Sequence, residues 1–264
     1  MHGRYGLIAS FRNDDICGVQ FARMKAITLL VLLLAGTAFS QARKAGMYAR
    51  TAIPIWDLLA DESGEDRPIR IPSPDRTALL IASSINDRDG GVRLTLRRHG
   101  TRIWSQRETP GVGIEAAWAP DSKAFFVTSS GGGRNGFYFL TVFFVNEDAV
   151  RELDVTPPIE TAFGHPVKCQ DKEPPNIAGL KWLSDSSGLI AVAEIVGHSN
   201  CDSNGTFRAY QLSLPEGRIS GSYDQIEAKR LFGGDLGWEI KNAPDRCILR
   251  PKSCWQYFNH NSGR

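Results

Sequence analysis

A phrase that combines an apolar opening, a turn with Asp and a second apolar run occurs three times in the 264-residue chain. The copies read IPSPDRTALLIASS (71–84), AWAPDSKAFFVTSS (117–130) and KWLSDSSGLIAVAE (181–194). Repeats spaced by about 40–60 residues are typical of propeller blades rather than of helical solenoids. The repetition therefore predicts an array of similar sheets, each begun by one copy of the phrase.

Each copy places a turn before a buried strand. Pro presets a turn dihedral and Asp accepts hydrogen bonds from nearby backbone amides. We therefore interpret Asp75, Asp121 and Asp185 as turn residues, and Asp121 is not expected to be a catalytic acid. A continuous apolar run is typical of a strand covered on both faces, as between stacked sheets. Such runs follow the turns at Ala78–Ala82, Ala124–Val127 and Leu189–Ala193.

Further strand patterns follow each copy and complete a unit of about four strands. Two Trp residues, Trp118 and Trp182, stand three residues before their Asp and are expected to pack against neighbouring sheets. One short helix is predicted, over residues 225–232. The strand pairs are predicted at 91–100 with 100–106, 136–148 with 149–155, and 206–217 with 218–223. The predicted fold class is all-β, with propeller-like blades of antiparallel four-stranded sheets.

The phrase resembles that of TolB-type, WD-repeat-like β-propellers of the exported bacterial type, whose usual form is W-S-P-D-G-K before a buried strand. The second copy matches it best, with Trp118, Pro120, Asp121 and Lys123 in place and Ser122 where the family has Gly. The resemblance covers roughly residues 70–225. It implies a propeller repeat and says almost nothing about function.

Three units are fewer than the four to eight blades with which propellers typically close. A fourth blade could be assembled from residues 48–70 and 225–258, with the two ends of the chain meeting in one sheet. The alternatives are an open, partial propeller or an oligomer that covers the exposed edges. The sequence does not decide whether the propeller closes.

The N-terminal region predicts export. Residues 24–42 have a lysine, an apolar run and then small residues, which is the layout of a signal peptide with cleavage after Ser40 or Ala42. The apolar run is short for a membrane span, so no integral segment is expected after cleavage. Residues 1–23 are interpreted as an over-extended start. The expected location is periplasmic or extracellular, with a lead-in at 43–70, repeats at 71–225 and a C-terminal segment at 226–264.

Four cysteines follow the predicted signal peptide, and an even number in an exported chain favours disulfides. We favour Cys169–Cys201 and Cys247–Cys254, because each pair is nearest in sequence, although four cysteines allow three connectivities. The second pair would tie down the C-terminal segment. A zinc site is the rival interpretation, but the absence of any CxxC disfavours it.

Several candidate sites come from residue type alone. His165, His198 and Asp202 lie near the cysteines in long loops and are the candidates for a metal site. Aromatic residues Trp238, Trp255 and Tyr257 near the C-terminus are candidates for binding a partner, since exposed aromatics are favoured as interface anchors. No GxSxG or HExxH motif occurs, so no catalytic residue is assigned and no cofactor is predicted.

The function favoured by these patterns is binding or scaffolding. A protein or small-molecule ligand is expected at the blade-end loops, chiefly 162–176 and 197–206. The alternatives are a metal-dependent hydrolase that uses loop histidines and carboxylates, and an accessory propeller module for a separate catalytic chain. The net charge of +2 gives no case for nucleic acid, which needs a concentrated basic face.

Overall fold

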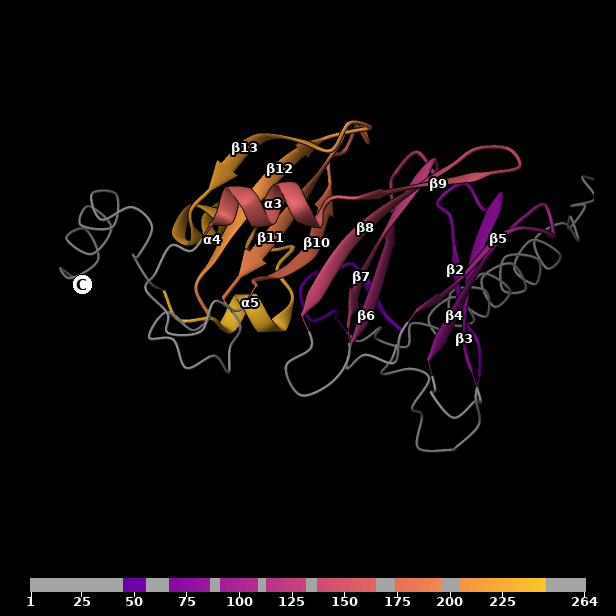
Figure 1. Cartoon of the computed structure of the whole chain (residues 1–264), viewed down its shortest axis with the longest axis horizontal. Coiled ribbons are helices and arrows are strands. Elements are labelled where there is room, and N and C mark those ends of the chain that lie inside the picture. Colours follow the sequence, from indigo (N-terminus) through magenta and orange to yellow (C-terminus); the bar gives the residue numbers. More distant parts are fainter. Residues whose placement is uncertain are drawn as a thin grey trace, which may run out of the picture. The chain divides into compact units, whose positions relative to one another are not determined.

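The computed structural model describes seven stretches of the chain. They are residues 45–55, 67–85, 91–108, 113–131, 137–164, 174–195 and 205–245. Contacts divide the chain into two compact units, residues 1–43 and 44–264, and every described residue belongs to the second. In that unit the chain forms three antiparallel sheets, which we call blades 1, 2 and 3 in chain order (Figure 1).

Blade 1 is a four-stranded sheet in which neighbours in sequence are neighbours in space. Its strands are β2 (Ile69–Pro72), β3 (Ala78–Ser84), β4 (Val92–Arg98) and β5 (Thr101–Glu108), in that order. The hairpin between β4 and β5 turns through His99 and Gly100, both with positive φ.

Blade 2 repeats this order and gains a fifth strand at one edge. Its own strands are β6 (Ile114–Trp118), β7 (Ala124–Ser130), β8 (Tyr138–Val145) and β9 (Val150–Asp154). The short β1 (Ile53–Pro54) pairs antiparallel with β6, so the lead-in closes the inner edge of this blade.

Blade 3 consists of β10 (Asn176–Trp182), β11 (Gly188–Glu194), β12 (Phe207–Ser213) and β13 (Arg218–Tyr223). The strand order is again the order of the sequence. The prediction of propeller-like, four-stranded antiparallel blades is therefore confirmed, and the strands fall at the predicted places.

Within the described residues, three helices accompany the sheets. The predicted helix is confirmed as α4 (Gln225–Phe232), whose N-cap Asp224 accepts a hydrogen bond from the amide of Glu227 at 2.9 Å. The helices α3 (Thr156–Phe163) and α5 (Trp238–Asn242) were not predicted. Two prolines open α3 and give it the appearance of a loop in the sequence, yet Pro is well suited to the first helical turn.

The Asp turns have the same hydrogen bonds in all three blades. The carboxylates of Asp75, Asp121 and Asp185 each accept from the amide two residues later, each at 3.0 Å. In blade 1 the Ser73 hydroxyl adds a bond of 2.6 Å, and these hydrogen bonds lower the pKa of Asp75 to about 2. The interpretation of these residues as turn formers is confirmed.

Consecutive blades are joined by two repeated contacts. The indole of Trp118 donates to the carbonyl of Ile71 at 3.0 Å, and that of Trp182 donates to Ala117 at 3.1 Å. Both Trp residues thus reach back to the preceding blade, as predicted.

The second contact involves the residue after each Asp. The hydroxyls of Ser122 and Ser186 accept from the amides of Asp75 and Asp121, at 3.0 and 3.1 Å. Both serines have positive φ, which explains why the related phrase has Gly there. Blade 1 has Arg76 at this position.

Burial separates the three phrase strands. Every residue of β11 is buried, and every residue of β7 is buried except Ser129, which is half-buried. In β3 the pattern alternates, because Leu79 and Ile81 are half-buried on the face that points away from blade 2. The prediction that all three runs are covered on both faces is therefore wrong for the first run.

The first and last described segments, 45–55 and 205–245, contact each other, but they do not build a fourth sheet in the described residues. A single bridge joins Ala49 to Leu236, and residues 225–232 and 238–242 are helical. Apolar residues of α4, α5 and their linker pack with Tyr48 on the free face of blade 3. The described blades form an open array whose last face is covered by helices.

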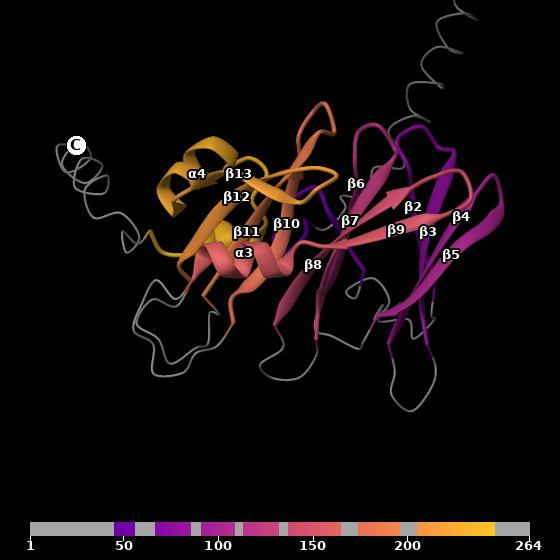
Figure 2. The same ribbon diagram turned by 45° about the horizontal axis from the view of Figure 1, so that its top comes forward.

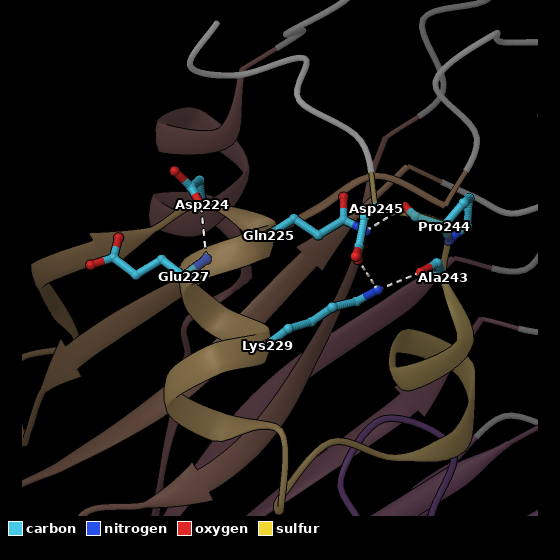
Figure 3. A network of polar contacts seen from close by, with 7 residues as sticks. All are labelled: Asp224, Gln225, Glu227, Lys229, Ala243, Pro244 and Asp245. Atoms are coloured by element: carbon cyan, nitrogen blue, oxygen red, sulfur yellow. Dashed lines mark hydrogen bonds and ion pairs between the residues drawn. The ribbon is translucent and has the colours of Figure 1, made fainter. Parts of the chain in front are cut away.

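Polar contacts hold α4 to the residues that follow α5 (Figure 3). Lys229 donates to the carbonyl of Ala243 and to the Asp245 carboxylate, and the Gln225 amide donates to the carbonyl of Pro244 at 2.8 Å. Lys229 is at the middle of α4 and Gln225 at its start, so one face of the helix carries both contacts. This network fixes the covering helices as one layer.

Candidate functional site

The sheets have two unlike edges. The Asp turns and the other short hairpin turns lie at one edge, which we call the turn edge (Figure 2). The connections after β3, β5, β7 and β11 leave from the opposite edge, which we call the loop edge. Of the two segments predicted to bind a ligand, 162–176 leads from α3 to β10 and 197–206 leads from β11 to β12. Most of their residues lie outside the described residues, and the strand ends that they join, at Asn176, Glu194 and Phe207, lie at the loop edge.

Buried carboxylates gather at the loop edge. Glu108 ends β5, Glu115 is the second residue of β6, and Glu194 ends β11, and all three are buried. Buried acids are costly unless they are hydrogen-bonded or neutral, so each of them needs an explanation. For two of these acids, hydrogen bonds from neighbouring groups provide the explanation. The third acid has no such explanation and is the strongest candidate for a functional group.

Glu115 binds backbone amides of the lead-in. Its carboxylate accepts from the amide of Met47 in a very short contact, and from those of Tyr48 and Ala49 at 3.2–3.3 Å. The lead-in residues 45–55, which we call the strap, are thereby held to the inner edge of blade 2. The role of Glu115 is structural.

Glu108 has a partner within its own strand. The Gln106 side-chain amide donates to it at 3.0 Å, while burial raises the pKa of the Glu108 carboxyl. Hydrogen bonds from Ser129 and Gln106 oppose that rise. This acid is accommodated by its neighbours.

Glu194 differs from the other two. Its side chain is 1% exposed, and neither carboxyl oxygen has a hydrogen-bond partner among the described residues. Burial, reinforced by the negative charge of Glu239, raises the pKa of Glu194 to about 8. The nearby Tyr48 hydroxyl lowers this pKa somewhat, but it lies outside hydrogen-bonding geometry with either oxygen. At neutral pH the group is a carboxylic acid that can donate one hydrogen bond.

The surroundings of Glu194 are polar and ordered. Asn176 pairs with Glu194 across β10 and β11; its amide donates to the Tyr48 hydroxyl at 2.8 Å, and its oxygen accepts from the backbone amide of Tyr138 at 3.3 Å. The Tyr48 and Tyr138 rings meet edge to face, with centroids 5.1 Å apart. Burial and the nearby acids raise the pKa of Tyr48 well above its usual value, so this phenol stays protonated.

Another buried polar atom precedes the residue that pairs with Glu194, which is Phe207. The hydroxyl of Thr206, the residue before β12, is buried without a partner among the described residues, and the Thr206 carbonyl accepts from Ile195 at 2.9 Å. We call Tyr48, Tyr138, Asn176 and Glu194 the loop-edge cluster. It combines an acid, two phenols and an amide, which can bind polar groups or hold a proton.

Of the site residues predicted from the sequence, only Trp238 lies within the described residues. Trp238 is described, as the first residue of α5, and its side chain is 53% exposed. It remains a candidate for partner binding. The other candidates lie outside the described residues: His165, His198, Asp202, Cys169, Cys201, Cys247, Cys254, Trp255 and Tyr257.

The described part of the chain contains neither a metal-binding cluster nor a membrane-spanning helix. No group of three or more His, Cys, Asp or Glu residues there could hold a metal ion. No helix in the same residues is long and apolar enough to cross a membrane.

Sequence reasoning missed Glu194, although the signal was present. The residue nine positions after the turn Asp is Ser84 in the first copy, Ser130 in the second and Glu194 in the third. A carboxylic acid where the other repeats have a small hydroxyl residue departs from the pattern of the array. Such a departure is where function is expected on a repeating scaffold.

Comparison with known proteins does not assign a family to the chain. No protein-family model matches the chain, and no curated protein matches it. The chain is similar to the structure of an acylaminoacyl peptidase of Pyrococcus horikoshii (orthorhombic crystal form), with 10% identity and a TM-score of 0.36. The match covers 60% of this chain and 25% of the peptidase, so the chain spans about a quarter of that protein's length. The propeller-like fold class is supported by the three antiparallel sheets themselves.

Proposed function

We propose that the chain is an exported binding or scaffold protein that holds a ligand or partner at the loop edge of blade 3. The observation that carries this proposal is the buried Glu194, whose oxygens have no hydrogen bond among the described residues. A structural acid is normally satisfied by its neighbours, as Glu115 is. An unsatisfied one in a cluster of polar groups is typical of a binding or reactive site.

The position of Glu194 supports the same conclusion. It pairs with Asn176 on one side and with Phe207 on the other, so it is flanked by the strand ends that carry both predicted binding loops. A ligand held by those loops would lie over a floor built by blade 3. Binding residues are commonly found on loops positioned by a rigid scaffold.

The protonated acid also indicates the kind of ligand. A neutral carboxyl at pH 7 can donate to an acceptor on the ligand and accept from a donor. A ligand with a neutral polar group would bind without a change in protonation. An amine or guanidinium would instead ionise Glu194 and release its proton on binding.

The test is to identify what the protein carries and then map its site. Native mass spectrometry of protein purified from its own cell envelope gives the bound molecule. Isothermal titration then compares the wild type with Glu194→Ala and with a variant whose loop 196–204 is replaced by Gly and Ser. We expect about ten-fold weaker binding for each, because a directed hydrogen bond or the loop contacts are lost.

A matched control lies at the turn edge. Lys123→Ala changes an exposed residue of the blade 2 turn, far along the strands from the loop edge. It should leave binding unchanged. Wild-type affinity in the Glu194 and loop variants, or a loss in Lys123→Ala, would refute the loop-edge proposal. Metal-dependent turnover of the identified molecule would favour the hydrolase alternative.

A further inference from the structure

The outer face of blade 1, which points away from blade 2, carries charges of one sign. The residues of β2 to β5 alternate between the two faces, and those at outward positions include five arginines and no acid. Exposed arginines account for every charge on this face of the described sheet. They are Arg70, Arg93, Arg97, Arg102 and Arg107.

Four of these arginines stand directly opposite each other on neighbouring strands. Arg93 pairs with Arg107 and Arg97 pairs with Arg102 across β4 and β5. Like charges at directly opposed positions destabilise a sheet. A terminal repeat needs only a polar outer face to stay soluble, and mixed charges would supply that without repulsion. The single sign therefore points to an anionic partner.

The centre of the same face is apolar. Leu79 and Ile81 of β3 lie between Arg70 on one side and the β4 arginines on the other, since Ile81 pairs with Arg70 and Leu79 with Arg97. Both side chains are only half-buried. An aliphatic centre ringed by arginine is typical of a protein interface, in which the core is apolar and Arg is enriched. A polyanionic chain or a lipid headgroup would bind to the arginines and would have no use for the apolar centre.

The equivalent face is covered in the other two blades. In blade 2 it carries Phe125 and Val127, which pack on blade 1, and in blade 3 it carries Leu189 and Ala191, which pack on blade 2. Blade 1 also lacks the residues that join one blade to the preceding one, because Pro72 stands at the Trp position and Arg76 at the Ser position. The outer face is thus built for something other than another blade of this repeat.

We propose that the outer face of blade 1 docks a protein partner whose contact surface has an apolar centre and an acidic rim. Charge complementarity selects this occupant. Two copies of the chain meeting through this face would bring arginine against arginine, so self-association there is disfavoured. The site is separate from the loop-edge cluster, and the failure of either proposal leaves the other standing.

Two variants test the two parts of the surface. Arg93→Glu/Arg97→Glu reverses the charge on β4, and Leu79→Ser/Ile81→Ser removes the apolar centre. The first should fold at least as well as the wild type, since each new Glu faces an arginine on β5. The matched control is Arg218→Glu, an exposed arginine on β13 of blade 3. Circular dichroism and thermal unfolding verify that all the variants are folded.

The experiment starts from the native cell envelope. Proteins bound by the wild type and lost on Arg93→Glu/Arg97→Glu are identified by mass spectrometry, and the partner is then purified and titrated. We expect an acidic partner whose affinity falls at least ten-fold in both double variants and is unchanged in Arg218→Glu. Raising NaCl from 50 to 500 mM should weaken the wild-type complex.

Other occupants give other results. Equal binding of wild type and Leu79→Ser/Ile81→Ser to heparin or to phosphatidylglycerol vesicles, with no protein lost on charge reversal, would overturn the protein assignment. Dimerisation that is abolished by Arg93→Glu/Arg97→Glu in analytical ultracentrifugation would assign the face to a second copy. A partner that binds all the variants equally would also refute the proposal.

Discussion

Leu79 in blade 1 and Leu189 in blade 3 hold the same place in their repeats, four residues after the turn Asp, and have different surroundings. Leu189 is fully buried between blades 2 and 3, whereas Leu79 is half-buried on a face that no described element covers. The far side of blade 3 is in turn covered by α4, α5 and the strap. The two ends of the array therefore differ. Helices pack on the outer face of blade 3, whereas exposed arginines lie on the outer face of blade 1.

The difference extends to the loop edge. Blade 3 ends its second strand with the buried Glu194, and blade 1 ends it with Ser84. The covered blade can hold a neutral acid in its interior because the strap and α5 surround that position with Tyr48 and Glu239. Among the described residues, blade 1 has no comparable enclosure. Covering one end of an open array thus creates a buried interior in which the pKa of an acid can be shifted.

The largest expected effect is a loss of stability at high pH that depends on blade 3. The pKa of Glu194 is about 8 in the folded protein against 4.5 for an ordinary glutamate, so folding favours the protonated form. Its contribution to stability is complete below about pH 4.5 and is lost as the pH rises through about 8. Linkage makes this loss on the order of several kcal/mol. Urea unfolding between pH 5 and 9 measures it.

Glu194→Gln separates this effect from general alkaline destabilisation. The amide cannot ionise and has the shape of the protonated acid, so most of the slope between pH 5 and 8 should disappear. A slope that is the same in the variant would show that Glu194 is ionised in the folded protein.

The next effect compares the two leucines directly. Leu189→Ala should lower the free energy of unfolding by about 3–4 kcal/mol, because it opens a cavity between two blades. Leu79→Ala should cost about 1 kcal/mol, because part of its side chain already faces solvent. Chemical denaturation of both variants provides the measurement. Equal losses would mean that the outer face of blade 1 is covered in solution, for example by a partner or a second copy.

The third effect is the loss of stability when the strap is released from Glu115. Glu115→Ala leaves the amides of Met47, Tyr48 and Ala49 without their acceptor in a buried position, which should cost about 2–3 kcal/mol. Hydrogen exchange should then become faster in residues 45–55 and on the covered face of blade 3, and stay unchanged in blade 1. Faster exchange throughout the array would show that the strap supports all three blades rather than one end.

The smallest effect concerns the contacts that join the blades. Trp118→Phe and Trp182→Phe each remove one indole hydrogen bond, to Ile71 and Ala117 respectively, and should each cost about 1 kcal/mol. Ser186→Gly should be nearly neutral, because the lost hydrogen bond is offset by relief of the positive φ. Thermal unfolding measures all three. A Trp182 effect several times that of Trp118 would show that the two junctions are not equivalent.

Much of the fold followed from local patterns. The Asp turns, the strands after them and the helix of residues 225–232 depend on neighbours in sequence, and all were predicted in place. The helix at Thr156–Phe163 was missed because Pro157 and Pro158 resemble a loop unless their place in the first turn is known. The candidate site was found only in outline, as two loops, because Glu194 carries no motif.

The sequence by itself determined the repeat, its turns and its strands, since periodicity and turn chemistry act over a few residues. Only the tertiary structure decided which faces are covered. The run after Asp75 is as apolar as the run after Asp185, yet the first has half-buried residues on one face and the second is buried on both. Covering a face requires residues distant in sequence, here the strap and the C-terminal helices, and no local pattern records where those segments come to lie.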